Sequence, residues 1–479
     1  MYELSSQYVR MVSMTKTYTP ELTPDVLDRL GDYAQLFRDD FAHKKQAAWS
    51  HVYLEGLLQD GDRKSIEPLA GRVTLPPYLD VKDPEQALQQ FVNQSPWDDD
   101  ALARRYRQHM AKTFASDTAI FVFDDTSFPK QGKHSVGVQW QYCGALGKKA
   151  NCQVAASVHY VSPQGHFPLA MRLFLPENWI KDKKRLDKAG VPESFHQFKT
   201  KGQIALELLD MVRGEGLPGW LVVTDAGYGV SEGLRNGLAQ RGLAYIVGVT
   251  DEMVVFTAEP TWAPPGPADR PQETGGRART RPRLAEGSPR PLSLKELAAR
   301  TPLRKVTWRE GTKGPLWGHF AWIRVWPGGG WATGACALAE PIWLLIERQA
   351  DGKLKYAFSN LPADTPRRRA VRLWKSRWPV EQGYQQQKEE LGLDHFEGRS
   401  WRGFHHHTCL VTLAYGFLVL ERLRMERHPA KPGKKGVPRR RSRCRRSVGR
   451  CSGYCARGHV PIAPIVTHVP DLEINDLRF

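Results

Sequence analysis

Long apolar runs are missing from this sequence. The most apolar stretch, 410–420, is well short of the roughly 20 residues that a membrane-spanning helix needs. The first residues show no basic segment followed by an apolar one, which is the pattern of a secretory signal peptide. We therefore expect neither a signal peptide nor a membrane segment.

Cysteine is scarce as well, with seven in 479 residues and no paired spacing before the C-terminal tail. This usage argues against a disulfide framework and suits a reducing compartment, so we expect a cytoplasmic protein. The remaining composition, 41% hydrophobic and 25% charged, excludes wholesale disorder, collagen and coiled coil. The length allows about three domains.

Acidic residues are absent from 427–450, which holds eleven Lys or Arg residues. The whole chain carries a net charge of +18, so much of the surplus lies in this short segment. Such runs are usually flexible arms that neutralise phosphates without reading sequence. We expect a polyanionic partner and assign 426–479 to a basic tail.

The first 115 residues predict a mostly helical domain. Thr-Pro at 23–24 and Ser-Pro at 95–96 are typical helix starts, and apolar residues recur at helical spacing after the first. Between them, 71–75 reads as a short strand. We take 1–115 as a helical N-terminal domain.

An alternation of strands and helices begins at residue 118. Apolar runs at 119–123 and 220–224 each end at an aspartate, and runs at 154–161 and 167–175 flank a turn and predict a hairpin. Helices are predicted at 203–212 and 232–241, and a further strand at 244–248. Parallel strands joined through helices require an α/β layered sheet, which sets the fold class for 116–250.

Eight prolines exclude regular structure from the segment 260–291. Strands are predicted beyond it at 305–308, 318–326, 331–339 and 342–347, so we take 251–347 as a β-rich insertion with a proline-rich linker. Helices predicted at 365–377 and 380–393 fall within 348–425, which completes the sheet domain.

Three carboxylates are candidates for chemistry. Asp124 and Asp225 end predicted strands, and Glu381 lies on the helix after the last strand. Carboxylate oxygens are the ligands that Mg²⁺ prefers, and a metal pair can activate the attacking oxygen and stabilise the leaving one in phosphoryl transfer. Arg377 and Lys388 share a helix face with Glu381 because they lie four residues before and seven after it. Any one of these residues alone is more often a cap or a solvated charge, so only the joint pattern indicates a site.

Neighbouring acids compete for the same roles. Side chains alternate along a strand, so Asp125 should point to the face opposite Asp124. Glu389 and Glu390 lie eight and nine residues beyond Glu381, roughly 12 Å or more along the helix, too far to replace it.

Several stretches resemble the DDE-type insertion-sequence transposases, in the branch with a Tyr-x2-Arg-x3-Glu-x6-Lys motif around its third acid. The resemblance spans about 45–425 and includes an Asp-x-Thr pattern beginning at Asp124. One departure is that Trp374 stands where the family usually has Tyr, and an indole cannot reproduce the reach of a phenol. The stretches are 53–58, 123–138, 151–153, 223–228 and Trp374-x2-Arg377-x3-Glu381-x6-Lys388.

The resemblance implies a ribonuclease-H-like mixed sheet flanked by helices and a cut-and-paste transposition reaction. Asp124, Asp225 and Glu381 would be the catalytic residues and would bind two Mg²⁺ ions, with Mn²⁺ able to substitute. Trp374, Arg377 and Lys388 would contact the DNA. The partners would be double-stranded DNA, both the terminal inverted repeats and the target, and a second copy of the chain when synapsed on DNA. The helical domain would bind the DNA ends, and the protein would be associated with the bacterial nucleoid.

Two rival interpretations remain open. A domesticated or inactive relative would keep the basic surface without the chemistry, but all three acids are present. A glycosidase would also place two acids at strand ends, yet its neutral substrate leaves the basic tail unexplained.

Three further features of the sequence are weaker indications of function. The Cys444, Cys451, Cys455 and His459 spacing fits no common zinc finger, so free thiols are the better interpretation. The run His405–His407 reads as a polar surface segment, since three consecutive residues cannot share a helix face. One of the tryptophans of the insertion could stack on a flipped base, although strand packing is the more common role. These are residues 308, 317, 322, 326 and 331.

Overall fold

The N-terminal part of the molecule is helical. The computed structural model describes residues 22–265, 280–311, 314–336 and 339–427. The segment 71–75, predicted as a strand, is irregular, because Gly71 ends a helix and two prolines at 76–77 begin the next turn. The helices are α2 (Pro24–Gln35), η1 (Arg38–Asp40), α3 (Lys44–Leu58), α4 (Ile66–Ala70), η2 (Pro77–Leu79), α5 (Pro84–Asn93) and α6 (Asp99–Phe114).

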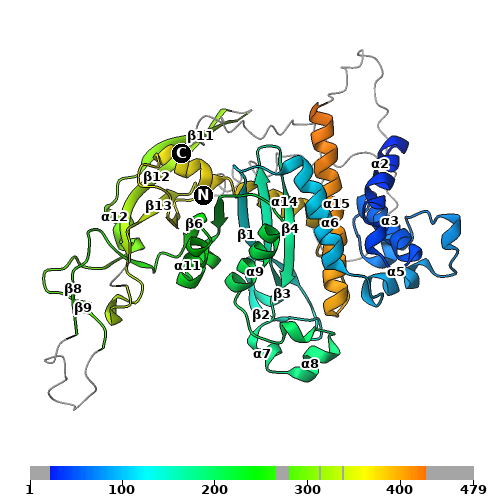
Figure 1. Ribbon diagram of the computed structural model, residues 1–479, viewed down its shortest axis with the longest axis horizontal. Helices are drawn as coiled ribbons and strands as arrows, with labels where there is room; N and C mark the ends of the chain where they lie inside the picture. The colour runs from blue at the N-terminus through cyan, green and yellow to red at the C-terminus, as the bar shows by residue number, and fades with distance from the viewer. Residues whose placement is uncertain (1–21, 266–279, 312–313, 337–338, 428–479) are drawn as a thin grey trace, which may run out of the picture.

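A twelve-stranded mixed sheet follows, in the order β10-β7-β12-β13-β14-β6-β5-β1-β3-β2, with β11 beside β12 and β4 beside β3 (Figure 1). A separate two-stranded ribbon joins β8 (Trp262–Ala263) to β9 (Arg283–Leu284). The strands of the large sheet are β1 (Ile120–Pro129), β2 (Gln139–Cys143), β3 (Lys148–Ser162), β4 (Gly165–Leu173), β5 (Leu221–Thr224), β6 (Ala244–Val249), β7 (Val254–Phe256), β10 (Leu292–Ser293), β11 (Arg304–Gly311), β12 (Gly314–Pro327), β13 (Ile342–Arg348) and β14 (Leu354–Ser359).

The centre of the sheet has the strand order β4-β3-β1-β5-β6. β3 runs antiparallel to both β1 and β4, whereas β1, β5 and β6 are parallel to one another. The predicted hairpin at 154–175 is confirmed as β3 and β4. The mixed sheet flanked by helices confirms the predicted α/β class.

The strands that follow β6 in sequence extend the same sheet. β14 pairs antiparallel with β6, and β13 and β12 continue outward from it. The predicted strands at 305–308, 318–326 and 342–347 are confirmed. The one predicted at 331–339 is wrong: a short 3₁₀ turn, η5 (Trp331–Thr333), lies between Gly330 and Gly334, whose positive φ angles of 72° and 69° interrupt extended backbone.

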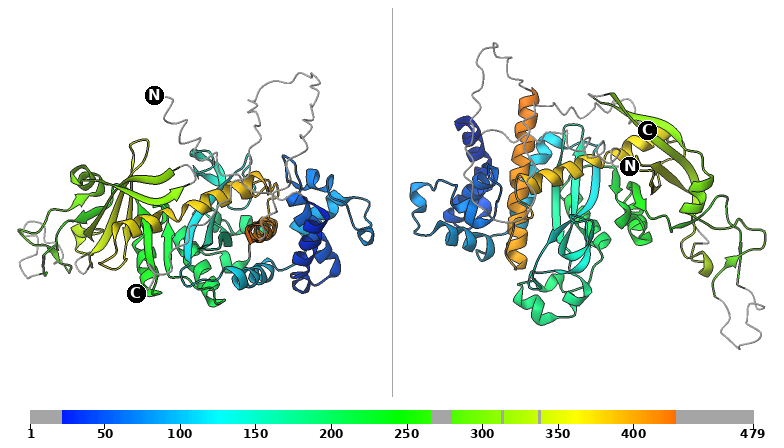
Figure 2. Two further views of the ribbon diagram at one scale, coloured as in Figure 1. Left: turned by 90° about the horizontal axis from the view of Figure 1, so that it is seen from above. Right: turned by 180° about the vertical axis from the view of Figure 1, so that it is seen from behind.

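Helices cover the sheet and connect its strands. α13 contacts the outer strands β11 and β12, and α14 contacts β1 and β4, so the two helices follow one another along the sheet (Figure 2). The connecting and covering helices are α7 (Glu177–Ile180), α8 (Lys183–Lys188), η3 (Glu193–Phe195), α9 (Lys201–Gly214), α10 (Ala226–Gly229), α11 (Glu232–Gln240), α12 (Leu294–Arg300), α13 (Arg367–Lys375), α14 (Trp378–Glu389) and α15 (Trp401–Arg427).

The long helix α15 lies between the sheet and the N-terminal helices, contacting β4 on one side and α3 and α5 on the other, with α6 packed beside it (Figure 1). A helix between two layers is buried all round, so His405, His406 and His407 are all buried. The prediction of a polar surface run is therefore wrong. Each ring finds a partner, among them Trp401 O for His405, Val92 O for His406 and Gly392 O for His407. Although α15 has 27 residues, no helix within the described ranges combines the length and hydrophobicity that crossing a membrane requires.

Because these histidines are buried, we expect the fold to lose stability in mild acid. Burial lowers the pKa of His405 and His407 to about 4 and that of His406 to about 3. Burial also lowers the pKa of His159 in β3 and of His166 in β4 to about 3. Each imidazole gains a proton only on unfolding, so stability falls as the pH drops below about 6.5, by up to about 1.4 kcal/mol per group and pH unit.

Buried carboxyls oppose this trend, because burial raises the pKa of both Asp99 and Asp124 to about 7 and the folded state then binds the proton. The five histidines outnumber these two groups. Thermal melts should therefore show a midpoint several degrees lower at pH 5.5 than at pH 7.5. An unchanged or higher midpoint at pH 5.5 would contradict the neutral, buried state of the histidines.

Candidate active site

Two aspartates lie side by side where parallel strands β1 and β5 end their pairing. Phe123 of β1 is in register with Thr224 of β5, so Asp124 and Asp225 are the next residues on adjacent strands. Asp225 leaves the strand and caps α10, accepting a hydrogen bond from Gly227 N at 2.9 Å. Asp124 stays within β1, which continues to Pro129. The two carboxylates are thus fixed by strand pairing and by a helix cap.

Helix α14 brings a third carboxylate to the same place. Arg377 precedes this helix and Glu381 occupies its first turn. Arg377 Nη1 lies 3.4 Å from Asp124 Oδ2, and its Nη2 lies 2.5 Å from Glu381 Oε1. A single guanidinium therefore joins acids that are more than 250 residues apart in sequence.

The backbone carbonyl of Asp124 is also held by hydrogen bonds. Its carbonyl oxygen accepts hydrogen bonds from Ser157 Oγ at 3.1 Å and from Tyr228 OH at 3.2 Å. Tyr384 of α14 also contacts the Ser157 hydroxyl. These three hydroxyl side chains were missed from sequence, although Tyr384 lies three residues after Glu381, on the same helix face.

The electrostatics of the cluster favour an added cation. Burial raises the pKa of Asp124 to about 7; Arg377 opposes the rise, and the nearby charge of Asp225 adds to it. The pKa of Asp225 is also raised, by burial and then by Asp125. Burial alone would lower the pKa of the Arg377 guanidinium, but Asp124, Glu381 and Asp225 together raise it. One guanidinium thus pairs with two carboxylates and also experiences the charge of a third, Asp225.

A divalent metal fits this donor set by its chemistry. Mg²⁺ binds carboxylate oxygens and keeps several waters, so a cluster of partly exposed acids with too little positive charge suits it. In the described ranges, no three His, Cys, Asp or Glu side chains are already grouped as a metal site. Arg377 lies between Asp124 and Glu381 and supplies the positive charge there.

Asp125 is close enough to raise the pKa of Asp225, but it has a different ion-pair partner. Its carboxylate contacts the ammonium of Lys201 at the start of α9, whereas Asp124 contacts Arg377 next to α14. The alternation of side chains along β1 accounts for the two different partners.

Lys388 lies near the opposite end of α14. Its Nζ donates to Ser127 O at 3.1 Å, and the ammonium lies 5.7 Å from the centre of the Phe128 ring. Burial lowers the pKa of Lys388. This cation therefore lies on the same side of β1 as Arg377, next to the strand that carries Asp124.

Unlike Arg377 and Lys388, Trp374 lies in the hydrophobic core. Its indole Nε1 donates to Glu347 Oε2 at 2.7 Å, and Lys375 contacts the other oxygen of the same buried carboxylate. The indole has only one donor, so a phosphate could be bound by Trp374 only at the expense of this bond. Nothing in the local sequence indicates Glu347, which lies on β13 and meets α13 only in the fold.

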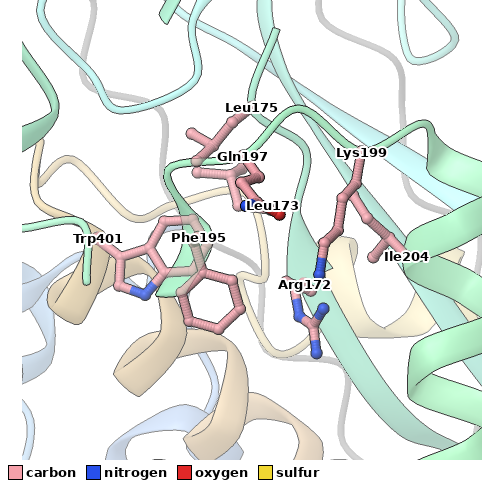
Figure 3. Close-up of a pocket in the computed structure, with 8 residues that line it drawn as sticks. All are labelled: Arg172, Leu173, Leu175, Phe195, Gln197, Lys199, Ile204 and Trp401. Carbon is pink, nitrogen blue, oxygen red and sulfur yellow. The ribbon is translucent and has the colours of Figure 1, made fainter. Parts of the chain in front are cut away.

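A separate cavity lies beside α9 and the start of α15 (Figure 3). Phe195 and Trp401 stand next to each other in it, with ring centres 4.9 Å apart, and Arg172 points toward the same space. Arg172 and Lys199 both pair with Glu207. The residues that line this cavity include none of the three candidate acids, so it is distinct from the carboxylate cluster.

Comparisons with known proteins identify the family of the chain. Residues 36–315, more than half of the chain, match the DDE superfamily endonuclease family, and this segment contains Asp124 and Asp225. The chain is 28% identical over 220 residues to the "Probable transposase for insertion sequence element IS701" of Microchaete diplosiphon. That similarity covers 46% of this chain and 53% of the relative, so the chain spans about half of the relative's length. The chain belongs to the DDE superfamily endonuclease family.

Proposed function

We propose that the protein is a DNA transposase that cuts the phosphodiester at each end of a mobile element and joins the freed end to target DNA. The observation that carries the proposal is the Arg377 bridge between Asp124 and Glu381 beside Asp225, in a chain with a net charge of +18. Three acids around one cation suit metal-assisted phosphoryl transfer on a polyanion. The similarity to a probable insertion-sequence transposase supports the same activity.

Asp124, Asp225 and Glu381 would hold the metal, two Mg²⁺ ions that Mn²⁺ could replace. When bound, the ions would activate the attacking oxygen and stabilise the leaving one. Water breaks the first phosphodiester and leaves a 3′-hydroxyl. That hydroxyl then attacks a phosphodiester of the target, so one P–O bond forms as another breaks.

The two basic residues of the helix would position DNA. Arg377 and Lys388 lie on the side of β1 that carries Asp124, and phosphate contacts fix the register of a protein on DNA. Trp374 is omitted from this role, because its indole donor is bonded to Glu347. The helical domain up to residue 115 would bind the element ends, and two copies would meet on the DNA. The protein would work in the bacterial cytoplasm, associated with the nucleoid.

A nicking assay on DNA that carries both flanks of the gene tests the function. We expect cuts at inverted repeats, dependent on Mg²⁺ and abolished by a chelator. A protein that binds these ends without cutting them in Mg²⁺ or Mn²⁺ would favour an inactive, DNA-binding relative, for which no residue of the site gives support.

Removing the chain after Arg427 should weaken binding to all DNA and flatten its salt dependence. This tail lies outside the described residues, but the deletion removes ten of the eleven cations of 427–450. Each neutralised phosphate contributes about 0.9 to the slope of log affinity against log salt. Binding titrations at several salt concentrations measure the change. An unchanged slope together with a lost preference for element ends would show that the tail reads sequence instead.

A further inference from the structure

Two aromatic side chains stand in solvent on the edge strand β2. Trp140 is 71% exposed and Tyr142 is 64% exposed, and Trp140 is the most exposed large apolar side chain in the described part of the chain. They are two residues apart on one strand, so they project from the same face. Exposing two large rings is costly unless a partner covers them.

The strand register places these rings on the face that carries the acids. Trp140 pairs with Asn151 of β3 and Tyr142 with Lys149, and further along β3 Ser157 pairs with Asp124. Alternate residues of β3 from 149 to 157 share one face. α14 covers the Ser157 end of this face, through the contact of Tyr384 with Ser157. Further along this face, Gln153 is buried and donates to Val136 O, and Asn151 donates to the same segment of the chain. The exposed end of the face is formed by Lys149, Tyr142 and Trp140, which we name the aromatic platform.

The platform is within reach of DNA bound at the acids. Lys149 and Ser157 are eight residues apart on β3, which is about 26 Å. Lys388 lies between these two levels, because its ammonium binds Ser127, whose partner on β3 is Val154. Arg377, Lys388 and Lys149 therefore mark a line of cations along one face of the sheet.

The charge around the platform fits a nucleic acid. The sequence has no Asp or Glu from residue 126 to residue 176, and Lys133, Lys148 and Lys149 are exposed there, whereas the ammonium of Lys130 is bonded to Phe396 O. Asn151 donates to Lys130 O at 2.7 Å and to Gly132 O at 2.9 Å, which fixes the preceding loop against the hairpin. A second copy of this chain would bring like charges together, so self-association through this face is disfavoured.

We propose that the platform binds unpaired nucleotides of the cut DNA end, with Trp140 and Tyr142 stacking on bases and Lys149 holding a phosphate. This inference rests on the proposed function and adds a single-strand site to it. The rings stand about 6.6 Å apart along the strand, roughly twice the 3.4 Å spacing of stacked bases, which leaves room for a base between them. Bases within an intact duplex are covered by their neighbours, so stacking selects unpaired ones, as on other sheet surfaces with exposed aromatics. Under this proposal the unpaired bases belong to the strand separated at the cut donor end, since an intact target duplex offers none.

The test compares binding of the full chain to two synthetic DNAs, a blunt duplex and the same duplex with a single-stranded extension. Stacking tolerates any sequence, so the extension can be arbitrary. We expect the wild type to prefer the extended DNA by tenfold or more. Trp140→Ala and Tyr142→Ala should each reduce that preference by about tenfold, whereas the phenylalanine variants at both positions should keep it.

Controls separate the possible failures. Phe198→Ala removes an exposed aromatic outside the platform and should leave the preference intact. Equal binding of both DNAs by a wild type that still cuts element ends would overturn the platform and leave the proposed function standing. No binding to either DNA and no cutting would instead reject the proposed function. A change of mass in solution with Trp140→Ala, without a change in DNA preference, would assign the surface to a second copy and also overturn the proposal.

Discussion

Asp124→Asn, Asp225→Asn and Glu381→Gln should each abolish metal-dependent DNA cleavage and leave DNA binding in place. An amide keeps the shape of the carboxylate but loses the charge that retains a divalent cation. Loss of one charge from Asp124 also removes a partner of Arg377, which remains paired with Glu381. Cleavage of end-labelled DNA and binding of the same DNA, measured on each purified variant, would separate the two effects.

Two matched variants control for charge. Asp125→Asn removes a carboxylate next to Asp124 that pairs with Lys201, and Glu389→Gln removes an exposed one on the same helix as Glu381. Both should remain active. Robust cleavage by a folded Glu381→Gln protein would falsify the assignment of the third acid.

Replacing Arg377 with alanine should have the second-largest effect, reducing cleavage by two orders of magnitude or more while lowering DNA affinity far less. Arg377 is partly buried, with 16% of its side chain exposed, and it is the cation shared by Asp124 and Glu381. Its removal leaves the buried Asp124 carboxylate without its cationic partner, and breaking a buried ion pair in this way typically costs about 3 to 5 kcal/mol. The melting temperature should therefore fall, and millimolar Mg²⁺ should restore part of it, because a ligand that binds only the folded state stabilises it.

Arg377→Lys keeps the charge and should recover most of the stability but less of the cleavage, since an ammonium cannot reproduce the planar fork. Lys388→Ala is the milder comparison, because Lys388 binds a backbone carbonyl and no acid. We expect it to impair cleavage more than affinity. If Arg377→Ala cuts DNA as fast as the wild type at subsaturating DNA, Arg377 has no place in the site.

Local patterns predicted the parts of the fold that depend on near neighbours. The strands before Asp124 and Asp225 are continuous apolar runs, and their side-by-side position follows from the rule that parallel strands end at a common edge. The shared face of Arg377 and Glu381 follows from their spacing of four residues, and the structure gives them a direct ion pair.

Long-range packing is what the sequence could not supply. The sequence of this helix does not show that other layers pack on both sides of it, so His405 to His407 were predicted to lie on the surface. The family resemblance implied a DNA contact for Trp374, and its hydrogen bond to Glu347, 27 residues away on another element, could not be foreseen from the local sequence. β2 was missed because its aromatic residues face solvent, the reverse of the pattern by which a half-buried strand is recognised.

Direct metal binding decides whether Asp124, Asp225 and Glu381 form a divalent-metal site. Mn²⁺ can be titrated into the full chain bound to DNA and the free ion followed by electron paramagnetic resonance. We expect two Mn²⁺ ions per chain in the wild type and loss of this binding when all three acids are replaced by their amides. The same number of tightly bound ions in the triple variant would contradict it.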